Sequence, residues 1–190
     1  MSLLVKQASE SDAAIMSKIC CLGWKRSYRG MLSDSLLNDL PEDYWTKDFR
    51  HLLKNRLVEA FLILKNSVPA GCIIYSVARE KKFKGYGEII ALYIHPDFYR
   101  RRYGEILITR AMNRLHELKM KHAYVWVLKK NKGARKFYKR MGFSCNGDEM
   151  DCPVSSREIV TDIRYVHKKK YTPINIQELL KEIENNKKRG

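Results

Sequence analysis

An amphipathic segment flanked by two short apolar runs constrains the fold of this chain more than any other part of its sequence. Residues 88–95 and 123–128 are apolar runs of strand length, and Pro96 ends the first of them. Between them, apolar side chains recur along residues 103–118 at the spacing of one helix face. A strand–helix–strand unit joins parallel strands through a right-handed crossover and leaves both strand ends pointing at a common site. We therefore expect the functional site there.

The remaining segments continue this alternation. Further strands are expected at residues 3–8, 59–64, 70–77, 143–149 and 157–167. Further helices are expected from Ser9 or Ser11 to Trp24, at 33–40, at 41–55 with Pro41 in the first turn, after Asn131, and at 174–183. This order predicts an α/β fold with one domain over residues 1–170, built on a mixed, mostly antiparallel sheet of about seven strands with helices on both faces. Residues 171–190 are expected to form a basic, partly helical tail.

The composition excludes several classes of protein. A hydrophobic share of 45% and an aromatic share of 11% are typical of a folded chain. No apolar run approaches the roughly 20 residues that span a bilayer, and the N-terminus has no charged segment followed by a long apolar one. The five cysteines form no CxxC pair, and no histidine lies at metal-binding spacing. We therefore expect free thiols, no metal site, no membrane association and a cytoplasmic location.

The formal net charge of +16 attracts polyanions such as nucleic acid or a phosphorylated cofactor. Part of this charge lies in the basic end of the chain, from Lys168 onward. No zinc finger or aromatic RNA-binding motif accompanies it, so a nucleic-acid partner is not expected, although the charge leaves that interpretation open. A generally basic protein explains the composition at least as well.

Residues 131–143, with the sequence NKGARKFYKRMGF, form the most informative motif. Asn131 fits the N-cap of a short helix, and Gly142 fits the left-handed residue that ends it. One face of this helix carries Ala134, Phe137, Tyr138 and Met141. A tyrosine on an apolar face brings a hydroxyl that needs a partner. It is either a core residue bonded to a nearby carbonyl or a functional group.

The residues that resemble the last signature of the GNAT N-acetyltransferase superfamily are Asn131, Ala134-Arg135, Phe137-Tyr138 and Gly142-Phe143. The resemblance covers roughly residues 3–167 and implies a GNAT-like fold with acetyl-CoA as the acetyl donor. In that family the tyrosine protonates the departing thiolate of coenzyme A, which assigns the leaving-group acid to Tyr138. The resemblance also implies that Asn131 bonds the pantetheine arm and that Arg135 belongs to the cofactor site.

A second motif, HPDFYRRRYGE, joins the first apolar strand to the amphipathic helix. Backbone amides at a helix N-terminus and nearby arginines suit a phosphate, although an arginine run alone is usually a solvated surface. The GNAT family has a pyrophosphate loop here, with Gln or Arg, two residues, Gly, one residue, then Gly or Ala. The corresponding residues of this chain are Tyr99, Arg100, Arg101, Arg102, Tyr103 and Gly104. The resemblance predicts cofactor binding by Arg100, Arg101, Arg102, Tyr103, Gly104 and Glu105.

Only the last glycine of that family pattern is kept in this chain. Arg102 stands at the middle glycine, which normally lets the backbone approach phosphate closely. We expect the Arg102 amide still to donate to phosphate, provided that its backbone is helical and its side chain turns outward. This departure is the main argument against an active enzyme.

Glu88 opens the first apolar strand. In the GNAT family an acidic residue here accepts a proton from the substrate amine, often through water, because only an unprotonated amine attacks a thioester. The alternative for Glu88 is a solvated residue at a strand edge, and the sequence leaves both open. The resemblance also implies a local bulge that frees backbone amides around residues 92–94 to polarise the thioester carbonyl. Tyr93 and Ile94 are therefore assigned to the cofactor site.

Trp24 and Tyr28 resemble the substrate-side helix and loop of the family, so we assign them to the acceptor pocket. The sequence thus predicts an acyltransferase, an N-acetyltransferase that moves an acetyl group from acetyl-CoA to a primary amine by direct attack in a ternary complex. The alternative is a non-catalytic acyl-CoA- or nucleic-acid-binding module on the same fold. The acceptor, a small molecule or a peptide, stays open, as do a homodimer, the cofactor affinity of the altered loop and the role of the basic tail.

Overall fold

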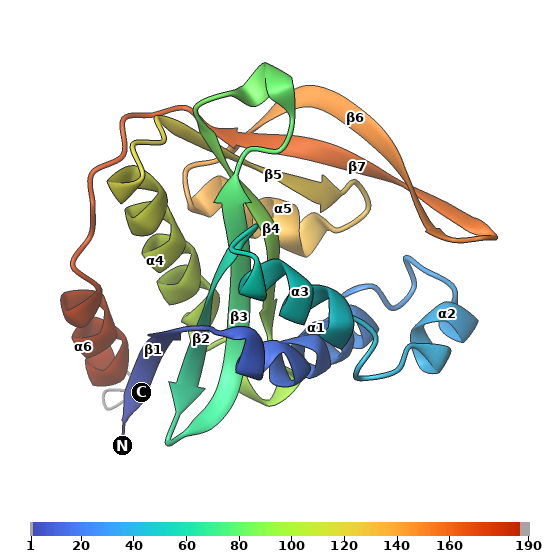
Figure 1. The fold of residues 1–190 in the computed structure, drawn as a ribbon, viewed down its shortest axis with the longest axis horizontal. Helices are drawn as coiled ribbons and strands as arrows, with labels where there is room; N and C mark the ends of the chain where they lie inside the picture. The colour runs from blue at the N-terminus through green and yellow to red at the C-terminus, as the bar shows by residue number, and fades with distance from the viewer. Residues whose placement is uncertain (1, 187–190) are drawn as a thin grey trace.

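A mixed seven-stranded sheet between two layers of helices organises the computed structural model, which describes residues 2–186 (Figure 1). The strands are β1 (Leu3–Gln7), β2 (Glu59–Lys65), β3 (Val68–Val77), β4 (Tyr86–Ile94), β5 (His122–Leu128), β6 (Ser144–Ser155) and β7 (Glu158–His167). Their order in the sheet is β1-β2-β3-β4-β5-β7-β6. Neighbouring strands are antiparallel except for β4 and β5, which are parallel. The fold class predicted from the sequence is confirmed.

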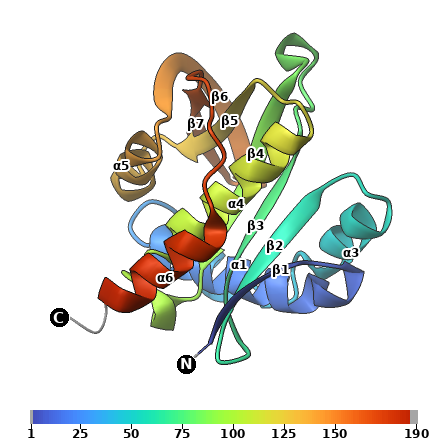
Figure 2. The same cartoon turned by 90° about the vertical axis from the view of Figure 1, so that its left-hand side faces the viewer.

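The helices are α1 (Ala13–Ser27), α2 (Asp34–Asp39), α3 (Thr46–Lys54), α4 (Tyr103–Glu117), α5 (Lys132–Arg140) and α6 (Ile176–Asn186), with 3₁₀ turns at Glu10–Asp12, Lys81–Phe83 and Pro96–Phe98. Helices α1 and α3 cover one face of the sheet, and α4, α5 and α6 cover the other (Figure 2). Strand β2 contributes side chains to the hydrophobic cores on both faces of the sheet. Ala60 and Leu62 pack towards α1, whereas Phe61 and Ile63 pack towards α4, because successive side chains of a strand point to opposite faces. No helix among the described residues is long and apolar enough to cross a membrane.

The helix predicted over residues 41–55, with a proline in its first turn, begins only at Thr46. A tertiary contact fixes the preceding turn instead. The hydroxyl of Ser17 in α1 donates to the carbonyl of Glu42 at 2.8 Å and accepts from the amide of Trp45 at 3.0 Å. These two bonds hold the segment in a turn that the local sequence does not reveal.

Strands β6 and β7 form a long hairpin that projects past the body of the domain towards α2 (Figure 1). Strand β6 continues to Ser155, beyond the predicted end at residue 149, because β7 supplies pairing partners along that length. The carboxylate of Glu158 at the start of β7 accepts hydrogen bonds from the amide of Ser33 at 3.2 Å and from its hydroxyl at 2.8 Å. The hairpin is thereby fastened to the connection between α1 and α2.

The predicted strand–helix–strand unit is present as β4, α4 and β5, and its two strands separate at one end. Strand β4 pairs with β5 only from Tyr86 to Ile89, yet it continues along β3 as far as Ile94. Ile90 is the extra residue of a bulge, since Ile89 and Ala91 oppose consecutive residues of β3. The bulge lies slightly earlier than the expected position. Beyond it, the edge of β4 that faces β5 has no strand partner among residues 2–186.

Residues 171–186 of the predicted tail pack on the domain. Leu179, Leu180 and Ile183 of α6 are buried in the core that α4 shares with the sheet. The Tyr171 hydroxyl donates to the Asn113 side-chain oxygen at 2.8 Å. The rest of the predicted tail, residues 187–190, lies outside the described residues.

Candidate active site

Tyrosines from three elements come together where β4 and β5 separate. Tyr28 follows the last residue of α1, Tyr93 lies on the free edge of β4, and Tyr138 lies on α5. The hydroxyls of Tyr28 and Tyr93 are 3.0 Å apart and hydrogen-bonded. Burial is the main cause of the raised pKa values of Tyr93 and Tyr138, and a smaller contribution from Tyr138 to the first and from Tyr28 to the second indicates that the three side chains are near one another. The structure therefore brings Tyr28, Tyr93 and Tyr138 of the predicted site together.

Tyr138 is held by aromatic packing and is 7% exposed. Its ring contacts Phe137 and Phe143 edge to face, with centroid distances of 5.2 and 5.6 Å. Burial raises the pKa of Tyr138 above its ordinary value, with a smaller contribution from Tyr28. No described residue makes a hydrogen bond to its hydroxyl, so the carbonyl that a purely structural tyrosine would need is not found there. The hydroxyl therefore keeps its proton at neutral pH.

A wall of aromatic rings lines the α1 side of the tyrosine cluster. Trp24 contacts both Tyr28 and Trp45, with centroid distances of 5.1 Å in each case. Gly23 makes this packing possible, because a Cβ atom at its position would lie 2.5 Å from the ring of Tyr93. The sequence indicated Trp24 and Tyr28 but missed Trp45 and Gly23, since only the fold reveals their contacts.

Asn131 and Arg135 position α5. The Asn131 side-chain oxygen accepts from the amide of Ala134 at 2.9 Å, which confirms the predicted N-cap. The Arg135 guanidinium donates to the carbonyl of Lys129 at 3.1 Å and to the hydroxyl of Tyr165 at 3.3 Å. In this structure Arg135 therefore braces the start of α5 against the sheet.

The connection between β4 and α4 has a left-handed backbone at two arginines. Arg102 has φ 60° and ψ 14°, and Arg100 has φ 59°. Arg102 therefore does not have the right-handed helical backbone that was the condition set for donation by its amide. The loop keeps the conformation that a glycine normally provides, with an arginine side chain attached. The amides of Arg101, Arg102 and Gly104 have no hydrogen-bond acceptor among the described residues, so they remain available to an anion.

The arginine side chains of this loop differ in their contacts. Arg102 forms a two-bond ion pair with Glu105, at 2.7 and 2.9 Å, and a further pair with Glu182 of α6 at 2.7 Å. Arg101 lies over the ring of Phe98, and Arg100 is exposed. The side chain of the adjoining Tyr103 is buried in the core. Of the predicted cofactor residues in this loop, Arg102 and Glu105 are thus bonded to each other.

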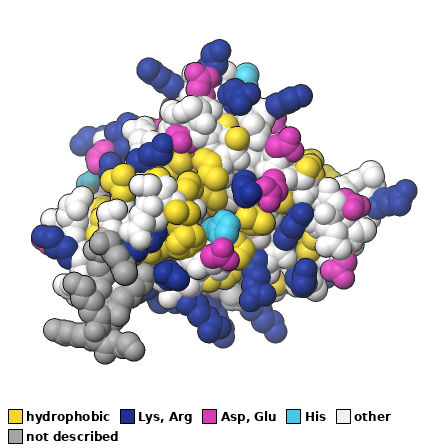
Figure 3. Space-filling view, turned by 90° about the horizontal axis from the view of Figure 1, so that it is seen from below, with side chains coloured by type: hydrophobic (Ala, Val, Ile, Leu, Met, Phe, Trp, Pro, Cys, Tyr) yellow, Lys and Arg dark blue, Asp and Glu magenta, His cyan; other side chains and the backbone are white. Residues whose placement is uncertain are grey.

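The lower end of the molecule in Figure 1 carries this connection. Seen from below, hydrophobic side chains gather in the middle of the face, and lysine and arginine side chains surround them (Figure 3). An apolar centre with a cationic border suits a ligand that has an apolar arm and several phosphates. No group of three or more His, Cys, Asp or Glu in the described part of the chain could hold a metal ion.

Glu88 lies one residue before the point where β4 and β5 separate, and it is only 4% exposed. It is therefore not the solvated edge residue that the sequence left open. Both of its carboxylate oxygens accept from Arg79, at 2.6 and 2.9 Å. The Arg79 side chain is 65% exposed, so it closes the carboxylate off from solvent without being buried itself. No local sequence pattern indicated Arg79.

The family assignment rests on the extent of the sequence match. Residues 19–143 match the model of the acetyltransferase (GNAT) family, and the match ends at the last residue of the signature motif. The chain belongs to this family. The resemblance predicted from the sequence is confirmed, and it places this GNAT protein in a family of acyltransferase enzymes.

Solved structures share the fold of this GNAT protein at low sequence identity. The PaiA N-acetyltransferase of Thermoplasma acidophilum, in complex with coenzyme A, is 18% identical, with a TM-score of 0.68 over 90% of this chain and 100% of that chain. YncA of Salmonella typhimurium, with acetyl-CoA, is 12% identical, with a TM-score of 0.66 over 92% and 99%. An uncharacterised N-acetyltransferase of Methanocaldococcus jannaschii is 30% identical over 103 residues, which cover 52% of this chain and 45% of that protein. The match thus spans about half the length of that curated relative.

Proposed function

We propose that this GNAT protein transfers an acetyl group from acetyl-CoA to a primary amine by direct attack in a ternary complex. The observation that carries the proposal is Tyr138, a buried, protonated tyrosine with no hydrogen-bond partner among the described residues, beside the gap between β4 and β5. A proton donor at this place is what a departing thiolate requires. Cys20 lies near Tyr28 and Tyr93, but its hydrogen bond with Cys72 and its burial raise the pKa of its thiol well above the ordinary value, which favours direct attack over a covalent route.

The residues present fit acetyl-CoA as the donor. The amides of Arg101, Arg102 and Gly104 would receive the pyrophosphate at the N-terminus of α4. The unpaired edge of β4 beyond Ile90 would hold the pantetheine arm and polarise the thioester carbonyl, as an oxyanion site does. When bound, the donor supplies an activated acyl group.

Protein groups then move two protons. As the amine nitrogen bonds to the carbonyl carbon, Glu88 accepts the proton that the amine loses, directly or through water. As the carbon–sulfur bond breaks, Tyr138 donates its proton to sulfur, and solvent restores the proton afterwards. Because Arg79 occupies both oxygens of Glu88, this role requires the exposed Arg79 side chain to move aside or a water to approach the free lone pairs.

Replacement of Tyr138 by phenylalanine tests the assignment. Loss of the proton donor should lower kcat by about 100-fold or more, since general acid catalysis contributes on that order. The dissociation constant of acetyl-CoA, measured by calorimetry, should change little, because the hydroxyl acts on the leaving group. Tyr171→Phe removes a hydroxyl that bonds Asn113 far along α4 and should keep the parent turnover. Equal turnover in Tyr138→Phe and the parent protein would sink the assignment.

A further inference from the structure

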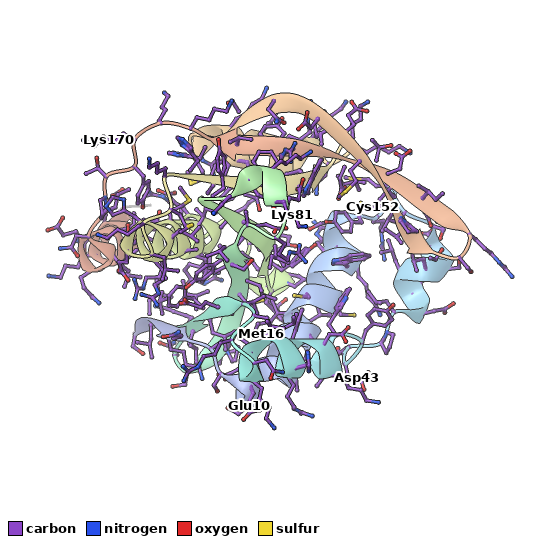
Figure 4. All side chains as sticks on the ribbon, turned by 45° about the horizontal axis from the view of Figure 1, so that its top comes forward. Glu10, Met16, Asp43, Lys81, Cys152 and Lys170 are labelled. Carbon is purple, nitrogen blue, oxygen red and sulfur yellow. The ribbon has the colours of Figure 1, made fainter. Side chains whose placement is uncertain are left out.

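One carboxylate beside the tyrosine cluster has no cation. Asp162 lies on β7, opposite Leu128 at the end of β5 and opposite Met150 of β6. It is half-buried, and no lysine or arginine of the described residues forms an ion pair with it. Its one hydrogen-bond partner there is the thiol of Cys152, at 3.7 Å. Figure 4 shows Cys152 on the part of the β6–β7 hairpin that passes over α1.

Three other carboxylates near this face of the sheet are matched by cations, whereas Glu158, on the same face of β7, bonds Ser33. Glu88 is bonded to Arg79. Glu80 and Asp148 both pair with Arg164, a fully buried arginine. Arg164 lies two residues from Asp162 on the same face of β7, but its guanidinium is held by these carboxylates and by the ring of Phe83, at 3.9 Å. It therefore does not neutralise Asp162.

Asp162 faces the acceptor side of the site. It lies on the same face of β7 as Glu158, which bonds Ser33 in the segment that follows Tyr28. Burial is the main cause of the raised pKa of Tyr28, and the charge of Asp162 adds to it. Burial raises the pKa of Asp162 itself, and the weak bond from Cys152 only partly offsets this effect. A partly desolvated carboxylate without a cation is costly, and a bound cation would remove that cost.

We propose that Asp162, with the hydroxyls of Tyr28 and Tyr93, binds the ammonium group of the acceptor before the amine is deprotonated. This inference rests on the proposed function and specifies its acceptor as a primary amine that arrives protonated. The net charge of the chain would repel such a cation at a distance, so Asp162 supplies the local attraction that the surface as a whole lacks. The bound ammonium then loses one proton to solvent water, and the free amine reacts as in the proposed reaction, with its second proton passing to Glu88 and the proton of Tyr138 passing to sulfur.

The test measures amine binding apart from turnover. Calorimetry with n-butylamine, putrescine and lysine amide is performed on the CoA-saturated protein, which cannot acetylate them. For each amine that the parent protein binds, Asp162→Asn should raise the dissociation constant by about tenfold or more, because a charge-assisted hydrogen bond is lost. In turnover, the KM of the amine should rise by a similar factor, whereas kcat should stay within about threefold.

Asp151→Asn is the matched control. Asp151 lies on the neighbouring strand β6 with its side chain on the opposite face, where it accepts from the Thr161 hydroxyl at 2.8 Å. The Asp151→Asn variant should bind the amines with the same affinity as the parent protein. Equal amine affinity in Asp162→Asn and the parent protein overturns the proposal, and so does a parent protein that binds CoA but none of the amines. A parent protein that fails to bind CoA or acetyl-CoA instead overturns the proposed function.

Discussion

Two residues near the proposed site, Arg102 and Asp162, are in states that are unfavourable for their residue types. Arg102 has a left-handed backbone conformation, which glycine adopts more easily than other residues, and Asp162 is a half-buried carboxylate without an ion-pair partner among the described residues. Such local costs often gather at functional sites, where binding a ligand compensates for them. The phosphates of acetyl-CoA and the ammonium group of the acceptor are the ligands that we propose for these two places.

The backbone of Arg102 predicts an unusual order of stability among variants. Arg102→Gly should be more stable than Arg102→Ala by about 1 kcal/mol, because only glycine adopts φ 60° without strain. Both variants lose the same ion pairs, so alanine is the control for the side chain. Urea unfolding measures the difference. Equal free energies of unfolding would show that the left-handed conformation carries no strain.

Asp162→Asn should stabilise the fold at neutral pH. The pKa of Asp162 is raised by burial, so the folded protein holds this proton more tightly than the unfolded chain, and stability falls as the pH rises through that range. Asparagine does not ionise, so the substitution removes this loss of stability at neutral pH. The melting temperature at pH 7 should rise by roughly 1–3 °C, a small change because solvent partly screens the half-exposed group. The advantage should shrink as the pH falls and should vanish below about 3, where aspartate is protonated in both the folded and the unfolded state. A lower melting temperature at pH 7 would contradict this account.

At the scale of elements, α6 couples the end of the chain to the cofactor loop. It packs on α4 through buried leucines and an isoleucine, and its Glu182 bonds Arg102 at 2.7 Å. Both partners are well exposed, so the ion pair itself contributes little to stability. Its effect should lie in binding, because Glu182 competes with phosphate for the same guanidinium.

Glu182→Gln should therefore tighten acetyl-CoA binding by about two- to fivefold, the range expected for one exposed charge pair. Calorimetry gives the dissociation constant. Glu178→Gln changes the same charge on the same helix, where Glu178 bonds Asn175 and not the loop, and it should leave the affinity unchanged. Weaker binding in Glu182→Gln would mean that the ion pair holds the loop ready for the cofactor.

At the scale of the whole molecule, the charge of +16 separates the proposed function from the alternative binding module. Acetyl-CoA affinity should fall only moderately between about 50 and 300 mM salt, because the loop amides donate hydrogen bonds as well as attracting charge. Binding of nucleic acid through general charge should fall much more steeply. Filter binding measures the affinity for nucleic acid and calorimetry the affinity for acetyl-CoA, each at several salt concentrations. Nucleic-acid binding that persists at 300 mM while CoA binding is absent would favour the alternative module.

Local sequence determined the elements and several of their ends. The spacing of apolar residues gave the strands and helices, Asn131 caps α5 as predicted, and Gly142 has the left-handed φ of 84° expected after that helix. These features depend on residues a few positions apart, so the chain specifies them wherever it folds. The motif around Tyr138 was sufficient to identify the family.

Tertiary structure alone decided which charged groups far apart in the sequence pair with each other. Arg102 meets Glu182 across 80 positions, and Arg164 meets Glu80 across 84. The isolation of Asp162 likewise depends on which cations the fold brings to the other carboxylates of that face. No local pattern encodes such pairings, because they follow from strand order and helix packing. The sequence by itself thus specified the scaffold and the tyrosine that we propose as the proton donor, whereas the fold determined which carboxylate was left for the substrate that we propose.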